Sequence, residues 1–451
     1  MVVVRLFRAP TVPSARVLLR GSPDGLPDRM AALTAGRDLV PLRAGPRDVV
    51  LIGDPGLARD LLTRPSGVGK GRGIDALKFL LGDGLLTAGG DLHRRQRRLI
   101  NPLFTPEKVA GYGMVAVSVA EARASAWTDG VRVDLLDEMG SVALDIVGQA
   151  LFGTDLRGDA DRIARALDIL LPIFPTLIRP FGFALLRVPN PVRSALRRAG
   201  AELDAVVDRL VEERAARPDP GGNDLLGALL AVRDEEGRPM PRQQVRDEAL
   251  TLLLAGHETT AVALAWAWFE LSRNPEARRW LEVELDDPST ESAIARADWH
   301  ALHRTRAVVA ESMRLHPPAH SIGRRLLVDQ DLGGHQLRGG TLCLISIYAL
   351  HRDPRSWSDP LTFAPRRWLD PTGVYDERAA GAPRGAYLPF GAGARICIGA
   401  TMAQMETTVV LARLAREFHA EVAEDFEPGN QAAVTLRPRR GVPATLRTRA
   451  R

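Results

Sequence analysis

Helical periodicity in the middle of the chain constrains its fold more than any other feature. From about Pro106 to Trp280, apolar residues recur at the three- and four-residue spacing that places them on one face of a helix. Strand-like runs flank this region, at Arg47–Gly53 before it and at Arg324–Val328 and Thr341–Tyr348 after it. The pattern predicts a mainly α fold with a smaller β region assembled from both ends of the chain.

No linker or internal repeat divides the 451 residues, so we expect a single domain over 1–451. Its β-containing parts are expected near 38–53 and 323–348, and its helical part over about 54–317. The longest apolar helix candidate runs from about Arg242 to Ser272 and ends before Asn274-Pro275. Residues 169–188 are apolar but contain three prolines, so they are not expected to form one regular helix. This segment is either a lid over an apolar pocket or a core loop.

Charge and cysteine content exclude several classes of protein. A formal charge of +5 on a chain of this size does not indicate nucleic-acid binding, although a local basic face could dock an acidic protein. Two cysteines cannot form a disulfide framework, which favours a reducing compartment. The N-terminal apolar run, Val2–Val4, is too short for a signal peptide or a membrane anchor. We therefore expect a soluble cytoplasmic protein with no membrane span.

Cys397 is the strongest candidate for a chemical role. It follows a glycine-rich loop, Pro389–Ile396, and precedes a helix expected from about Ile398 to Phe418. A thiol at a helix N-terminus beside backbone N–H groups and Arg395 is favoured as a thiolate. The sequence has no second cysteine nearby for a zinc or iron–sulfur site, so a single axial bond to haem iron fits best. Cys343 lies in an apolar run and is expected to be a buried hydrophobic residue.

The segment FGAGARICIG, Phe390 to Gly399, resembles the haem-binding signature of the cytochrome P450 family. A dinucleotide-binding loop is the nearest alternative, but this segment lacks its third glycine and its strand–loop–helix unit. The resemblance extends from about Asp48 to Leu446. It implies the P450 fold, with a long central helix over haem b, Cys397 as the metal ligand, and Phe390, Gly391 and Gly399 among the cofactor-binding residues.

A basic run, residues 93–98, contains two further positions that match the family. His93 and Arg97 are four residues apart and share one side of a helix, whereas Arg94, Arg95 and Arg98 are expected in solvent. By the resemblance, four side chains hold the two haem propionates: His93, Arg97, Arg324 and Arg395. Arginine suits this role because its forked donor pairs with a carboxylate.

A charge triad is implied by the same resemblance. Glu311 and Arg314 stand at positions i and i+3 of a helix that ends before Pro317-Pro318, and Arg367 lies in a loop that resembles the triad's third partner. On their own, Glu311 and Arg314 would be interpreted as a solvated pair. Within the family pattern they form a buried triad that supports the cysteine loop, and we expect each member to be costly to remove.

The long apolar helix is interrupted by AGHETT, residues 255–260. Glu258 and Thr259 match the family's acid–alcohol pair, which is implied to be catalytic because it delivers protons during dioxygen activation. Thr259 could instead satisfy a core carbonyl. Gly256 is expected to leave room for a diatomic ligand, and Ala255, Gly256 and Ile322 are expected to line the substrate pocket.

The resemblance implies a haem-thiolate monooxygenase that uses O2 and two external electrons to oxidise a hydrophobic small molecule. The substrate is expected to be a natural-product intermediate such as a terpenoid. With no fused redox module, electrons are expected from NAD(P)H through a separate ferredoxin and ferredoxin reductase. A peroxide-driven haem-thiolate peroxygenase and a non-catalytic haem-binding protein remain alternatives, and an NAD-dependent dehydrogenase would need a Rossmann unit that the sequence lacks.

Overall fold

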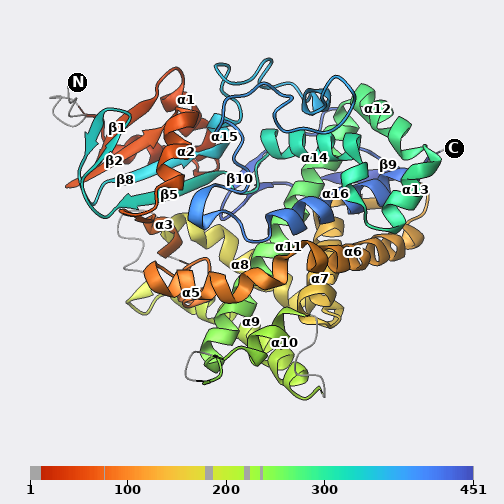
Figure 1. Cartoon of the computed structure of the whole chain (residues 1–451), viewed down its shortest axis with the longest axis horizontal. Helices are drawn as coiled ribbons and strands as arrows, with labels where there is room; N and C mark the ends of the chain where they lie inside the picture. Colours follow the sequence, from red (N-terminus) through yellow and green to blue (C-terminus); the bar gives the residue numbers. More distant parts are fainter. Residues whose placement is uncertain (1–11, 76, 178–185, 218–223, 234–236, 450–451) are drawn as a thin grey trace.

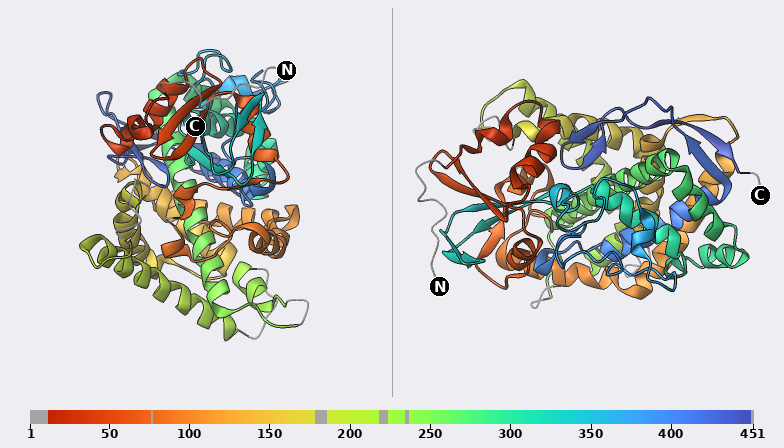
Figure 2. Two further views of the ribbon diagram at one scale, coloured as in Figure 1. Left: turned by 90° about the vertical axis from the view of Figure 1, so that its left-hand side faces the viewer. Right: turned by 90° about the horizontal axis from the view of Figure 1, so that it is seen from above.

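A β-rich side and a larger helical side make up the molecule (Figures 1 and 2). The computed structural model describes residues 12–449 except 76, 178–185, 218–223 and 234–236. The helices are α1 (Leu26–Thr34), α2 (Pro55–Thr63), α3 (Arg72–Asp75), α4 (Lys78–Leu81), α5 (Gly90–Ile100), α6 (Pro106–Ala126), α7 (Leu135–Phe152), α8 (Ala160–Leu177), α9 (Pro191–Ala215), α10 (Leu225–Ala231), α11 (Arg242–Arg273), α12 (Pro275–Leu285), α13 (Pro288–Ala295), α14 (His303–Leu315), α15 (Ile347–Leu350) and α16 (Ala400–Glu417).

The main sheet joins segments from both ends of the chain in the order β1-β2-β8-β5-β3. Its strands are β1 (Leu39–Ala44), β2 (Arg47–Ile52), β8 (Leu342–Ser346), β5 (Ser321–Leu326) and β3 (Val68–Lys70). The parallel pair β2–β8 places Val50 opposite Cys343, and the antiparallel pair β3–β5 places Lys70 opposite Arg324. This arrangement confirms the expected β region near 38–53 and 323–348.

Smaller sheets complete the β structure. They comprise β4 (Arg132–Asp134) with β12 (Pro443–Thr448) and β9 (Phe418–Glu421), the pair β6 (Gln330–Leu332) and β7 (His335–Leu337), and the hairpin of β10 (Asn430–Ala432) and β11 (Leu436–Pro438). The strands after residue 417 were not predicted, because they have only three to six residues each, which is short for a sequence pattern to identify.

Helix α11 passes through the centre of the helical side and packs against α7, α9, α14 and α16 (Figure 1). Trp266 and Trp268, both almost fully buried, anchor its second half in the core. The helix ends at Arg273 because Asn274 precedes Pro275 and adopts a non-helical backbone. By length and composition α11 could cross a membrane, and it is the one such helix among the residues that the structure describes. Most of it is buried inside the fold, as is usual for the core helix of a globular protein.

One expectation about local structure is wrong in part. Helix α8 continues to Leu177 through Pro172 and Pro175, where the prolines were expected to interrupt it. Helix α8 packs along α9, and such tertiary contacts can override the low helix propensity of proline. Residues 178–185 of the same segment lie outside the described part of the chain, so its role as a lid stays a prediction.

Candidate active site

Cys397 lies at the end of a tightly folded loop, three residues before α16 begins. Its backbone N–H donates to the Phe390 carbonyl oxygen at 2.9 Å, which closes the loop. Gly391 and Gly393 have φ values of +72° and +71°, a region that favours glycine. A Cβ on Gly393 would also collide with the Leu62 carbonyl oxygen, so the loop packs closely against the end of α2. The glycines are therefore required for the path of the chain that presents Cys397.

The Cys397 thiol is accessible to solvent, yet protein surrounds it closely enough to affect its protonation. Burial raises the pKa of this thiol, and the backbone N–H of Gly399 and the charge of Arg97 oppose the shift without reversing it. Loop and helix therefore favour the thiolate, as expected, but burial opposes them more strongly. A metal cation at the sulfur would supply the missing stabilisation, because a coordinating thiol is deprotonated by the ion itself. Cys343 is fully buried, and burial raises its pKa to about 12.

Basic side chains from four separate segments converge beside this loop. Arg97 donates to the Ile396 carbonyl at 2.7 Å, and Arg395 donates to the Ala88 carbonyl at 3.0 Å. The group comprises Lys70 of β3, His93 and Arg97 of α5, Arg324 of β5 and Arg395 of the cysteine loop. The expected solvent positions in α5, namely Arg94, Arg95 and Arg98, are exposed.

Repulsion among these basic side chains lowers the pKa values of two of them. Burial lowers the pKa of His93 to about 4, with further contributions from Arg395, Arg97, Lys70 and Arg324. Burial and Arg395 lower the pKa of Arg324 to about 10. Within the part of the chain that the structure describes, the group forms one ion pair with a carboxylate, Lys70 Nζ to Asp75 at 3.7 Å. An anionic ligand would relieve this imbalance.

Lys70 is the member that the sequence reasoning missed. Its Nζ is buried and makes no hydrogen bond to the described part of the chain. The residue pairs across the sheet with Arg324, so the two cations stand side by side. A lone lysine in a three-residue strand has no distinctive sequence signal, and only the register of β3 against β5 places it here.

The donor set as a whole fits a haem. One accessible thiol can supply an axial ligand, and the basic group can hold two carboxylates. No cluster of three or more His, Cys, Asp or Glu side chains suited to a metal ion occurs among the described residues.

On α11, the residues at 255–259 divide between two directions. Ala255 is exposed although most of the helix around it is buried, and Thr259 Oγ1 donates to the Ala255 carbonyl oxygen at 2.7 Å. A Cβ on Gly256 would lie 2.9 Å from Val147 Cγ2 of α7. The structure therefore gives Gly256 a role in close packing between α7 and α11, and the expectation that it makes room for a ligand finds no support in this direction. His257 is buried beside Gly140 of α7, as expected for a packing residue.

Glu258 turns toward the C-terminal hairpin. Thr435 Oγ1 donates to Glu258 Oε1 at 2.9 Å, and Arg437 Nη1 lies 3.7 Å from the same oxygen. Burial raises the pKa of Glu258, while Arg437 and the Thr435 hydroxyl oppose the shift and Asp168 adds to it. Glu258 and Thr259 are therefore adjacent in sequence but have different hydrogen-bond partners, since the Thr259 hydroxyl donates to the Ala255 carbonyl oxygen. Neither hairpin partner was predicted, because both lie far from Glu258 along the chain.

The third expected pocket residue, Ile322 on β5, packs close to the cysteine loop. A Cβ on Gly391 would lie 3.4 Å from Ile322 Cδ1. Phe390 and Gly399 flank the cysteine, and Phe390 supplies the carbonyl that closes the loop. The structure thus brings Ile322 close to Gly391, and Phe390 and Gly399 close to Cys397.

The charge triad is assembled as the sequence predicted. Glu311 and Arg314 are fully buried and joined by two hydrogen bonds of 2.8 and 2.9 Å, and Arg367 Nε lies 3.2 Å from Glu311 Oε1. Trp368 Nε1 and the Ala364 backbone N–H also donate to Glu311, at 2.8 and 2.9 Å. The carboxylate is therefore a hub of five donor bonds, two of which come from residues that were not predicted.

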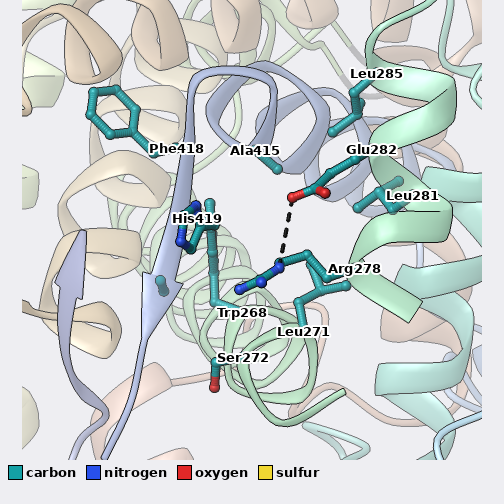
Figure 3. A pocket seen from close by; sticks show the side chains of 11 residues that line it. Trp268, Leu271, Ser272, Arg278, Leu281, Glu282, Leu285, Ala415, Phe418 and His419 are labelled. Atoms are coloured by element: carbon teal, nitrogen blue, oxygen red, sulfur yellow. Dashed lines mark ion pairs between the residues drawn. The ribbon is translucent and has the colours of Figure 1, made fainter. Parts of the chain in front are cut away.

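A small apolar hollow of about 10 Å³ lies near the far end of α16 (Figure 3). It is lined by the ends of α11 and α16 with α12 and β9, and the ion pair between Arg278 and Glu282 crosses it at 3.7 Å. Its volume suits about one water molecule. Ala415 on its wall is about 20 Å along α16 from the cysteine loop, at about 1.5 Å per residue. This hollow therefore takes no part in the site.

Comparisons with known proteins agree with this geometry. A family model described as "Cytochrome P450" matches residues 31–442. The chain is 37% identical to cyclooctatin synthase of Streptomyces melanosporofaciens, covering 92% of this chain and 90% of that protein. It is 33% identical to pentalenene oxygenase of Streptomyces avermitilis, covering 91% and 90%. The crystal structure of CYP175A1 from Thermus thermophillus superposes with a TM-score of 0.73 at 28% identity, covering 93% of this chain and 94% of that one.

Proposed function

The chain belongs to the cytochrome P450 family of monooxygenases, and from this premise we propose that it hydroxylates a terpenoid intermediate with two electrons from a separate ferredoxin. Three relatives are named for cyclooctatin, cyclooctat-9-en-7-ol and pentalenene, which are compounds of the terpenoid class. The single observation that carries the enzymatic assignment is an accessible Cys397 beside an unbalanced group of half-buried cations.

Each part of this site has a role in holding haem b. Cys397 would be the axial ligand, and Lys70, His93, Arg97, Arg324 and Arg395 would hold the propionates. Bound haem would supply the chemistry that activates O2 for attack on an unactivated C–H bond. The loop glycines let backbone N–H groups approach the sulfur, and such hydrogen bonds tune a haem's electronic properties. We propose that the chain forms one domain, 1–451, around this cofactor.

Residues of α11 and β5 would orient the substrate and handle protons. Ala255 and Ile322 present small and apolar surfaces suited to a hydrophobic molecule. Glu258 would be the proton donor, because burial raises its pKa and so favours its protonated form. Thr259 supplies a hydroxyl that can exchange its bond to the Ala255 carbonyl for one to a ligand.

Electron supply is assigned to a small acidic ferredoxin and its NAD(P)H-dependent reductase in the cytoplasm. Exposed Arg94, Arg95 and Arg98 lie on the same helix as Arg97, which bonds to the cysteine loop. A basic face at this position would attract an acidic carrier and bring it close to the cofactor.

The test uses the purified holoenzyme with a surrogate ferredoxin and reductase, with pentalenene and cyclooctat-9-en-7-ol as probes. We expect a product that carries one oxygen atom from isotopically labelled dioxygen, and none with Cys397→Ala. Product formed from hydrogen peroxide alone, without the redox partners, would favour a peroxygenase. Absence of oxidation for these and a panel of other terpenoids, despite reduction of the haem, would overturn the proposal.

A further inference from the structure

The carboxyl group of Glu258 is held by a hairpin that the reaction site does not otherwise use. Thr435, in the turn between β10 and β11, donates to Glu258 Oε1 at 2.9 Å, and Arg437 of β11 stands 3.7 Å from that oxygen. Glu258 and Thr435 are almost fully buried, whereas Arg437 is partly exposed. The acid is therefore fixed by one neutral donor and one cation from the same short hairpin.

The hairpin itself is fastened to the core, so these contacts have a defined geometry. The Leu436 backbone N–H donates to the Pro318 carbonyl oxygen at 2.9 Å, and Trp266 Nε1 donates to the Leu436 carbonyl oxygen at 3.0 Å. Trp266 lies on α11, about two turns beyond Glu258. One helix thus contacts the hairpin at two adjacent residues, which holds the Thr435 hydroxyl at Glu258.

Beyond Arg437 lies a polar hollow of about 330 Å³. Asp137 at the start of α7, Asp168 of α8 and the segment from Arg437 to Gly441 are among its lining residues. Asp137 and Asp168 are exposed, so the hollow communicates with solvent and has room for several water molecules. Arg437 is the side chain that belongs both to the hollow and to the contacts of Glu258.

We propose that Thr435 and Arg437 are positioning residues for Glu258, and that this polar hollow supplies its protons from solvent. The inference rests on the proposed function, in which Glu258 donates protons. When Glu258 gives its proton toward Thr259, the resulting carboxylate is held by Thr435 and Arg437. A hydrated proton from the hollow then restores the carboxyl, so one proton moves inward while Glu258, Thr435 and Arg437 end unchanged.

The charges around Glu258 suit this cycle. Burial favours the protonated carboxyl, Arg437 and Thr435 favour the carboxylate, and Asp168 across the hollow favours the protonated form again. Arg437 also acts on Asp137, whose pKa burial and Asp134 raise. Glu258 therefore has groups beside it that favour each of its two forms, which suits a group that must gain and lose a proton in each cycle.

The first experiment is infrared difference spectroscopy of the holoenzyme, with the Glu258 band identified by its loss in Glu258→Gln. Thr435→Val should move the carboxyl C=O band to higher frequency, and Thr435→Ser should restore it. Arg437→Gln should shift the band's titration to higher pH, and Arg437→Lys should shift it less. The matched control is Thr305→Val, which removes a buried hydroxyl that donates to another glutamate, Glu284, at 2.7 Å. It should leave the Glu258 band unchanged.

The second experiment measures ferredoxin-driven dioxygen uptake in H2O and D2O, with cyclooctat-9-en-7-ol as the probe and without it. A hydrogen bond to a charged group can shift an orientational equilibrium by roughly tenfold. We therefore expect Thr435→Val and Arg437→Gln each to slow uptake by roughly that factor, to enlarge the solvent isotope effect, and to add nothing in a Glu258→Gln background. Thr305→Val should have no such effect.

The outcomes separate two failures. Unchanged uptake in Glu258→Gln would remove Glu258 from the proposed function and the present inference with it. Suppose instead that Glu258→Gln slows uptake. Unchanged uptake in both hairpin variants would then overturn the positioning role alone, and so would equal slowing by these variants in the Glu258→Gln background. The proton-donor role of Glu258 would then stand.

Discussion

Replacing Glu311 by Gln tests the charge triad at the carboxylate where its contacts meet. The Glu311 carboxylate accepts two hydrogen bonds from Arg314 and one each from Arg367, Trp368 and the Ala364 backbone. Glutamine keeps the shape but removes the charge and turns one acceptor into a donor. Arg314, which is fully buried, would then lack its counter-charge.

The structure ranks the triad members, which the sequence could not do. Breaking a fully buried pair by removing one charge costs about 3–5 kcal/mol of unfolding free energy, and we expect this range for Glu311→Gln. Arg367 makes one longer contact of 3.2 Å, and its side chain is 13% exposed. We expect about 1.5–3 kcal/mol for Arg367→Gln, the scale of a single hydrogen bond to a charged group. The sequence predicted a high cost for removing any member, whereas the structure predicts a larger loss of unfolding free energy for Glu311→Gln than for Arg367→Gln.

The measurement is urea unfolding of the holoenzyme at neutral pH, together with the haem content of each purified variant. Glu284→Gln is the matched control, because Glu284 accepts from the backbone N–H groups of Arg304 and Thr305 and from the Thr305 hydroxyl, with no buried guanidinium among these donors. It should cost less than Glu311→Gln. A loss for Arg367→Gln as large as that for Glu311→Gln would refute the ranking.

Acid sensitivity supplies an independent check. Burial alone would raise the pKa of Glu311, but the hydrogen bonds and charges of Arg314 and Arg367 hold it below its usual value. A carboxyl with a depressed pKa stabilises the fold above its unfolded-state pKa, and this contribution is lost as pH falls through the folded-state value. Glu311→Gln should therefore weaken the dependence of stability on pH in the acid range. An unaltered acid limb would show that Glu311 does not provide it.

Three further predictions concern the cofactor site. Cys397→Ala should abolish the thiolate signature in the CO-difference spectrum of the dithionite-reduced protein, whereas Cys343→Ala should retain it; a normal spectrum from the first variant would remove Cys397 as ligand. Thr259→Ala should retain haem and substrate binding but release more peroxide per NAD(P)H, and equal coupling in both proteins would leave Thr259 a purely structural role. Lys70→Met should raise the unfolding free energy of the haem-free protein, because it removes a buried ammonium that makes no hydrogen bond to the described part of the chain. It should also speed haem transfer to apomyoglobin. A more stable haem-free protein that loses haem faster identifies a ligand-binding cation, whereas a less stable one identifies a structural cation.

Sequence patterns predicted those parts of the structure that depend on neighbours along the chain. Helix α11 matches its expected bounds within a residue, since its apolar run and the Asn274-Pro275 stop are local signals. Asp54 caps α2 by accepting from the Leu57 N–H at 2.7 Å, and Pro55 occupies the first turn, so this helix also begins at a local signal. The family's motifs predicted residues whose spacing is distinctive, such as Glu311 with Arg314.

Features that depend on distant segments were missed or misread. Lys70 joins the basic group only through the register of β3 against β5, and Thr435 reaches Glu258 across the hairpin. Gly256 was assigned to a ligand because glycine leaves space, but the direction of that space depends on α7, where Val147 fills it. For Cys397, the sequence indicated the backbone N–H groups that favour a thiolate, but not the burial that opposes them.

The members of the basic group repel one another, and this repulsion accounts for the number of segments that supply them. Five cationic or ionisable side chains near one point repel one another, so each needs rigid support from its own element: β3, β5, α5 or the loop. The members come from four elements rather than one, so most of the approaches between them are tertiary. Distribution over four segments means that the repulsion arises only after the tertiary structure has formed. The fold can then oppose it with the packing of α11, α14 and α16, and the carboxylates of a bound cofactor would remove it.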